Sequence, residues 1–121
     1  MYRGDDKDFA FTLTQDALPV DLTGAAIVFS GRAADDFDAD EAAAFTLSEA
    51  DGDIDILTDQ ATTGKGKVTV TIPADVSVDL LGLYLCDVEV TLGGEVWTWP
   101  EPAYGQSTLI RLKVKADVTH P

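Results

Sequence analysis

The sequence predicts an all-β fold, a single immunoglobulin-like antiparallel β-sandwich of about seven or eight strands with one short helical turn. Segments in which apolar and polar residues alternate recur along the chain, with turn residues between them roughly every 8–15 positions. No strand–helix–strand rhythm of a parallel sheet is present, so sheets that each bury one face must pack against each other. The length of 121 residues, 45% of them hydrophobic, suits one domain with its own core.

The first strand is predicted by aromatic residues at every second position. Phe9, Phe11 and Leu13 alternate with small or polar residues, which is typical of a half-buried strand with its aromatic side chains inward. Residues 15–19 predict a turn, and residues 25–30 predict a second apolar strand.

The middle of the chain is less regular. Residues 33–44 are rich in Ala and Asp and fit either a long loop or a short helix. Residues 45–47 and 54–57 predict short strands on either side of a turn at Asp51 and Gly52.

The predicted helical turn follows a strand with a β-branched residue at every second position from Val68 to Ile72. Pro73 ends that strand, and Pro is tolerated at the start of a helix. We therefore expect the helical turn over residues 73–81, where Gly82 interrupts it.

The second half carries the clearest alternation. Residues 83–92 predict a strand with one acidic or hydroxyl-bearing face and one apolar face, the latter formed by Tyr84, Cys86, Val88, Val90 and Leu92. Gly93 and Gly94 are a two-residue hairpin signal, and residues 95–99 return as the partner strand. Residues 108–115 predict the last strand, with Ile110, Leu112 and Val114 inward.

The ends of the chain are predicted to lie outside the sandwich, residues 1–7 as an N-terminal arm and residues 116–121 as a C-terminal tail. The N-terminus has no apolar run of signal-peptide type, so we expect synthesis in a cytoplasm without an export signal. No stretch approaches the ~18 consecutive apolar residues of a transmembrane helix.

Charge restricts the class of partner. The chain has 22 acidic and 8 basic residues and a net charge of −14, a field that repels phosphate backbones and anionic lipid surfaces. We expect neither nucleic-acid nor membrane partners. Residues 1–60 hold 15 acids and 3 bases, whereas residues 61–121 hold 7 acids and 5 bases. This asymmetry fits either an acidic face opposite a nearly neutral docking face, or solvated Asp-rich loops.

The residues needed for common catalytic chemistry are scarce. The chain has one Cys, Cys86, on the inward face of the best strand, and one His, His120, near the C-terminus. A nucleophilic thiol requires a base beside it, so Cys86 is expected to be a small core residue. Phosphate-binding, dinucleotide, zinc and Ser–His–Asp motifs are absent from the sequence. We predict a protein that is not an enzyme and that uses no cofactor.

Two groups of acids are weak candidates for a cation site. Asp51, Asp53 and Asp55 have the alternate spacing that can converge on Ca²⁺, but an EF-hand would need Gly and Glu where Ile56 and Thr62 stand. The alternative is an Asp–Gly–Asp turn. A second cluster fits cation binding, contact with a basic partner or a solvated loop, and comprises Asp35, Asp36, Asp38, Asp40 and Glu41.

Trp97 and Trp99 alternate within one strand, so both indoles point to the same face. Since Val96 and Thr98 lie on the other face, we favour the indoles inward, in the core. If they point outward, they form with Tyr104 an aromatic strip of the kind that stacks on sugars or anchors protein interfaces. Residues 100–105 are the predicted exposed interaction loop.

Three of the eight bases, Arg111, Lys113 and Lys115, lie on the outward face of the last predicted strand. Two pairings remain open. They pair with aspartates of a neighbouring strand, or they contact the acidic face of another copy, which would assemble the chain head to tail.

Several segments together resemble a family of small β-sandwich domains in tailed-phage virion proteins, most closely the N-terminal domain of baseplate upper proteins. The similar segments are residues 3–13, residues 19–25 around Asp21-Leu22-Thr23-Gly24-Ala25, residues 66–73, and residues 82–90, in which a Gly-x-Tyr strand follows a helical turn. The resemblance covers residues 3–115. It implies a non-enzymatic part of a virion that docks other subunits, in several copies within a symmetric assembly.

Members of that family usually continue into a longer C-terminal region that carries the receptor-binding protein, whereas this sequence ends at Pro121. We therefore expect a structural or adaptor subunit of the tail or baseplate, located in the virion. The alternatives are a capsid decoration protein, or a carbohydrate-binding or adhesion module built on Trp97, Trp99 and Tyr104.

Overall fold

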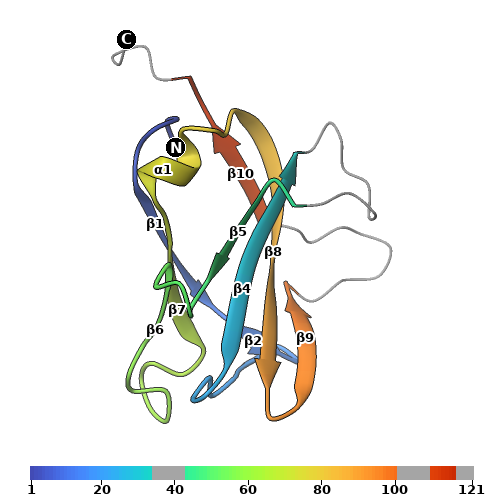
Figure 1. Cartoon of the computed structure of the whole chain (residues 1–121). Helices are drawn as coiled ribbons and strands as arrows, with labels where there is room; N and C mark the ends of the chain where they lie inside the picture. The colour runs from blue at the N-terminus through green and yellow to red at the C-terminus, as the bar shows by residue number, and fades with distance from the viewer. Residues whose placement is uncertain (34–42, 101–109, 117–121) are drawn as a thin grey trace.

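The computed structural model describes residues 1–33, 43–100 and 110–116 (Figure 1). Two antiparallel sheets pack face to face, and one short helix, α1 (Ala74–Ser77), lies at the upper end between them in the view of Figure 1. The predicted all-β sandwich is confirmed.

The smaller sheet has three strands in the order β1 (Lys7–Thr12), β7 (Lys67–Ile72) and β6 (Ile54–Ile56). Its inward face is the one that alternation predicts. Val68, Val70 and Ile72 are at most 1% exposed, while the positions between them face outward.

The larger sheet has the order β10 (Ile110–Val114), β8 (Gly82–Leu92), β4 (Ala26–Ala33) and β5 (Phe45–Ser48). β9 (Glu95–Trp99) also pairs with β8. A separate small hairpin joins β2 (Thr14–Gln15) to β3 (Leu18–Pro19), within the turn expected at residues 15–19.

β9 and β10 share one edge of β8, the edge that faces away from β4. Trp99, at the end of β9, lies opposite Val88, and Ile110, at the start of β10, lies opposite Cys86. The two short strands therefore form one interrupted edge. The predicted hairpin before β9 is confirmed, with positive φ angles of 60° at Gly93 and 84° at Gly94.

The core combines the inward faces of both sheets. Phe11 of β1 stacks on Phe29 of β4 across the interior with 6.0 Å between ring centroids. The ring of Phe29 also contacts the ring of Phe45, and the ring of Phe45 packs edge-on against Tyr84. This row of rings runs through the sandwich and ends beside α1.

α1 is shorter than the predicted span of residues 73–81. After it the chain makes i→i+3 bonds, in which Asp79 N donates to Val76 O and Leu80 N donates to Ser77 O. The buried Ser77 hydroxyl accepts from Gly4 N at 3.1 Å and donates to Asp5 O at 2.7 Å. The helix therefore fastens the N-terminal segment to the sandwich.

The predicted N-terminal arm follows the edge of β10 over its first residues. Arg3 N donates to Lys115 O, and Lys115 N donates to Met1 O, around a parallel bridge between Tyr2 and Lys115. Residues 117–121 of the predicted tail lie outside the described part of the chain.

A buried glutamine joins the loops at the opposite end of the sandwich. Gln60, 3% exposed, accepts from the backbone N–H groups of Leu22 and Gly66 through Oε1, both at 3.0 Å. Its Nε2 donates to the carbonyl oxygens of Leu57, Gly64 and Lys67 at 2.8–3.2 Å. One side chain thus satisfies backbone groups of two connections that lead into different sheets.

Cys86 is fully buried in β8, as predicted, and burial followed by the charge of Asp87 raises the pKa of its thiol from 9.0 to about 12. We expect the thiol to resist alkylation until the chain unfolds, as measured by iodoacetamide labelling with and without denaturant. Above pH 9 the unfolded chain loses this proton and the native chain keeps it, so stability falls with rising pH. Cys86→Ala should flatten that fall; rapid labelling of the native chain would contradict the prediction.

Candidate functional site

The indoles of Trp97 and Trp99 point inward and pack half-buried on the core, so the favoured orientation is confirmed. The ring of Trp99 contacts the ring of Phe11 edge-on, with 5.6 Å between ring centroids. The Nε1–H of Trp99 donates to Thr14 Oγ1 at 3.2 Å. A sugar-binding face would need exposed aromatic rings, but Trp97 and Trp99, two of the three rings in the predicted aromatic strip, pack against the core instead. Tyr104 and the rest of the predicted interaction loop after Pro100 lie outside the described residues.

The aspartates proposed for a cation site do not converge. The backbone N–H of Asp53 donates to Ser48 O, and its carbonyl oxygen accepts from Thr71 N. Asp55 faces outward on β6 opposite Thr69. Asp51 is exposed in the turn between β5 and β6. Within residues 1–33, 43–100 and 110–116, no group of three His, Cys, Asp or Glu side chains is arranged to hold a metal ion. The acidic cluster at residues 35–41 and His120 lie outside these ranges.

The three bases of the last strand are exposed and outward, as predicted. Their neighbours on β8 are not aspartates: Arg111 lies opposite Leu85, and Lys113 lies opposite Leu83. On the other side of Leu85, β4 places Arg32 in register. The register therefore places leucines, not aspartates, directly opposite Arg111 and Lys113.

We call this surface the basic strip, defined as Arg111, Lys113 and Lys115 with Leu83 and Leu85. Leu83 is 39% exposed on the outer face of the larger sheet. The sequence alone could have identified Leu83 and Leu85 as unusual. They occupy outward positions of the predicted strand over residues 83–92, where later outward positions such as Asp87 and Glu89 are acidic. Leu83 and Leu85 thus place apolar area beside Arg111 and Lys113 on the outer face of the larger sheet.

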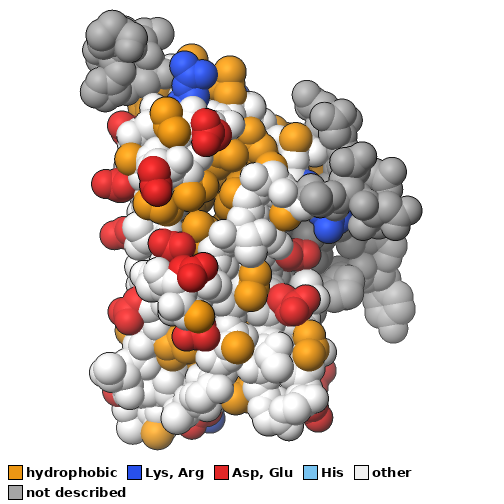
Figure 2. All heavy atoms as spheres, in the orientation of Figure 1, with side chains coloured by type: hydrophobic (Ala, Val, Ile, Leu, Met, Phe, Trp, Pro, Cys, Tyr) orange, Lys and Arg blue, Asp and Glu red, His pale blue; other side chains and the backbone are white. Residues whose placement is uncertain are grey.

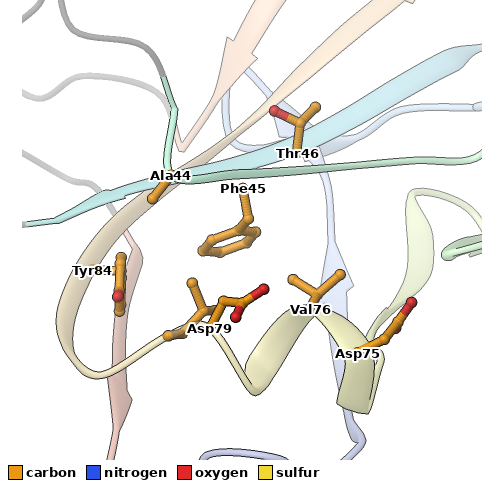
Figure 3. A pocket seen from close by; sticks show the side chains of 8 residues that line it. Ala44, Phe45, Thr46, Asp75, Val76, Asp79 and Tyr84 are labelled. Atoms are coloured by element: carbon orange, nitrogen blue, oxygen red, sulfur yellow. The ribbon is translucent and has the colours of Figure 1, made fainter.

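A pocket between α1 and the start of β5 was not predicted from sequence (Figure 3). We call it the α1–β5 pocket. Its volume is about 330 Å³, and it is lined by Ala44, Phe45, Thr46, Asp75, Val76, Asp79, Leu80 and Tyr84.

The floor of the pocket is apolar and its rim is acidic. Phe45 points from β5 toward α1, where Val76 and Asp79 face it (Figure 3). Asp75, in α1, and Asp79, in the turn that follows it, are both exposed at the margin of the pocket. Tyr84 closes one side, 6.0 Å from Phe45 between ring centroids.

Tyr84 is held in place by its hydroxyl, which accepts from Leu81 N at 2.9 Å and donates to Leu81 O at 3.3 Å. These two hydrogen bonds span the short connection between α1 and β8, and apolar side chains of this connection face outward. Val78 is 52% exposed and Leu81 is 54% exposed. Figure 2 shows hydrophobic side chains gathered at this upper end, with carboxylates around them.

The described residues form no helix with the length and apolar character needed to cross a membrane. Comparison with family models, curated proteins and solved structures finds no match to this chain.

Proposed function

We propose that this chain is a non-enzymatic structural subunit of a tailed-phage virion, in the tail or baseplate, that docks other virion proteins. The resemblance of residues 3–115 to virion β-sandwich domains supports the phage assignment. The basic strip is the observation that carries the docking role.

Leucines and bases side by side make the basic strip suited to a protein partner. Protein interfaces combine an apolar centre with polar groups at the margin, and Arg is enriched in them. Leu83 supplies exposed apolar area, and Arg111 and Lys113 flank it in register from β10. In a chain with a net charge of −14, such a surface selects partners with acidic and apolar groups.

The immunoglobulin-like assignment of the sandwich is part of this proposal. One sheet of three strands faces one in which β8 lies between β4 and the β9–β10 edge. Tyr84, near the start of β8 and two residues before Cys86, bonds back to Leu81 in the manner of a tyrosine corner.

A capsid decoration protein remains the alternative within the virion, since a small acidic β-domain also suits a capsid exterior. The inward packing of Trp97 and Trp99 disfavours the carbohydrate-binding alternative.

The decisive experiment is sedimentation of particles from a native lysate, followed by mass spectrometry of the particle fraction. We expect the chain to co-sediment with virions at a fixed stoichiometry, with a copy number typical of a tail rather than of a capsid shell. A chain that stays entirely in the soluble fraction would contradict the proposal.

Matched variants test whether the basic strip docks the chain. Leu83→Ser combined with Lys113→Gln should reduce rebinding of purified protein to particles that lack it. Val96→Ser is the control, because Val96 is 62% exposed on the same outer face of the larger sheet, beyond the strip. Equal rebinding of all three proteins would argue against this surface.

A further inference from the structure

We infer that the α1–β5 pocket receives the basic strip of a second copy of this chain, so that copies associate head to tail. The inference rests on the proposed structural role and names a partner for two of its surfaces.

The pocket has the chemistry to bind a long basic side chain. Lys and Arg side chains lay their apolar stems along hydrophobic surface and keep their charged ends in a polar setting. Half-buried Val76 supplies most of such a surface, since Phe45 and Leu80 line the pocket only with the small part of each side chain that is not buried, and Asp75 and Asp79 lie at its rim. Carboxylates are the partners that form charge-assisted hydrogen bonds with guanidinium and ammonium groups.

The strip supplies the matching groups in a regular row. Alternate residues of a strand lie about 6.8 Å apart on one face, so Arg111 and Lys113 of β10, with Lys115 directly after it, present three bases in one row. Leu83 beside them offers apolar area to the rim of the pocket. Each surface therefore combines apolar area with one sign of charge, and the two signs are opposite.

Net charge makes this pairing selective. Two copies that each carry −14 repel one another in most orientations. The basic strip holds three of the eight bases in the chain, so contact through it is the arrangement in which attraction most readily offsets repulsion.

The two surfaces are placed for a heterologous contact. β10 and β5 occupy opposite edges of the larger sheet, with β8 and β4 between them. At about 4.8 Å per strand the edges are roughly 14 Å apart, and the strip lies on the outer face while the pocket opens beside α1. One copy thus uses its strip on the next copy and its pocket on the previous one, which generates a ring or a filament.

The test uses two neutralised proteins and their mixture, measured by sedimentation velocity over a range of concentrations. The pocket variant carries Asp75→Asn and Asp79→Asn, and the strip variant carries Arg111→Gln and Lys113→Gln. All four side chains are exposed, so both variants should fold, with unchanged circular dichroism.

We expect the natural chain to exceed its monomer mass of 12.9 kDa and to grow with concentration, while each variant alone stays at 12.9 kDa. Mixing the variants should restore one contact, between the intact strip of the pocket variant and the intact pocket of the strip variant. The product is a 1:1 dimer that does not extend. Asp51→Asn with Asp55→Asn is the control and should associate like the natural chain.

A natural chain that remains monomeric at every concentration would overturn the inference, as would association that both variants retain. Restoration of longer assemblies on mixing would also overturn it, because it requires a different contact. None of these results bears on co-sedimentation with particles, so the proposed function and the head-to-tail contact fail separately.

Discussion

Gln60→Glu should destabilise the folded chain by about 3–5 kcal/mol, much of the total stability expected of a domain of this size. The change keeps the shape of the side chain and replaces the amide nitrogen by oxygen. Three carbonyl oxygens, from Leu57, Gly64 and Lys67, now receive hydrogen bonds from that nitrogen. A buried carboxylate would repel all three and would carry an unpaired charge.

The pH dependence identifies the cause. Burial and the surrounding carbonyl groups disfavour the charged form, so the pKa of the introduced carboxyl rises above its unfolded value of roughly 4.3. A raised folded pKa means that stability is lost as pH rises. The deficit relative to the natural chain should therefore be smaller at pH 5 than at pH 8 in urea unfolding.

Two further variants separate charge from lost hydrogen bonds. Gln60→Leu should also destabilise the chain, because the N–H groups of Leu22 and Gly66 lose their acceptor, but its deficit should not change with pH. Gln15→Glu, at an exposed position of β2, should have little effect. A deficit for Gln60→Glu below 1 kcal/mol, on the scale of one ordinary hydrogen bond, would show that the loops do not depend on this side chain.

Gly31→Ala should cost about 1–3 kcal/mol, because β4 passes the core with no space for a methyl group. A Cβ at this position would lie 2.5 Å from Cε1 and 2.6 Å from Cζ of Phe45, and 2.9 Å from Sγ of Cys86. These atoms belong to packed core side chains that have little room to retreat.

A double-mutant cycle tests this steric cause. Phe45→Leu alone removes packing and should destabilise the chain, yet it also removes the ring atoms that the new methyl would overlap. Gly31→Ala combined with Phe45→Leu should therefore cost less than the sum of the two single changes. Additive costs would assign the loss at Gly31 to something other than the ring.

Strands with strict alternation were predictable, because one buried face imposes a period of two on the sequence. Residues 95–99 match β9, and residues 83–92 match β8 to within one residue. β4 runs three residues past the predicted end at Ser30, because Gly31 breaks the apolar pattern at the inward position that must pass Phe45. In the sequence, Gly31 suggests the end of a strand. In the fold, the strand continues through Gly31, and packing against Phe45 requires that this position have no side chain.

The surfaces were less predictable, because they depend on residues distant in sequence. Arg111, Lys113 and Lys115 were identified as an outward row, but their leucine neighbours depend on the register between β10 and β8. The α1–β5 pocket forms where Phe45 meets Val76, some thirty positions later in the chain. Local periodicity contains no information on that meeting.

The interrupted edge of β8 makes the chain suitable for carrying inserted peptides. Trp99 and Ile110 lie opposite Val88 and Cys86, two positions apart on β8, so the end of β9 and the start of β10 lie close together on one edge of the sheet. The entropy cost of closing a connection between two such neighbouring points grows only slowly with the length of the connection. Epitopes or affinity tags placed between Pro100 and Ile110 should leave the register of both flanking strands intact, which makes this position the natural starting point for display engineering.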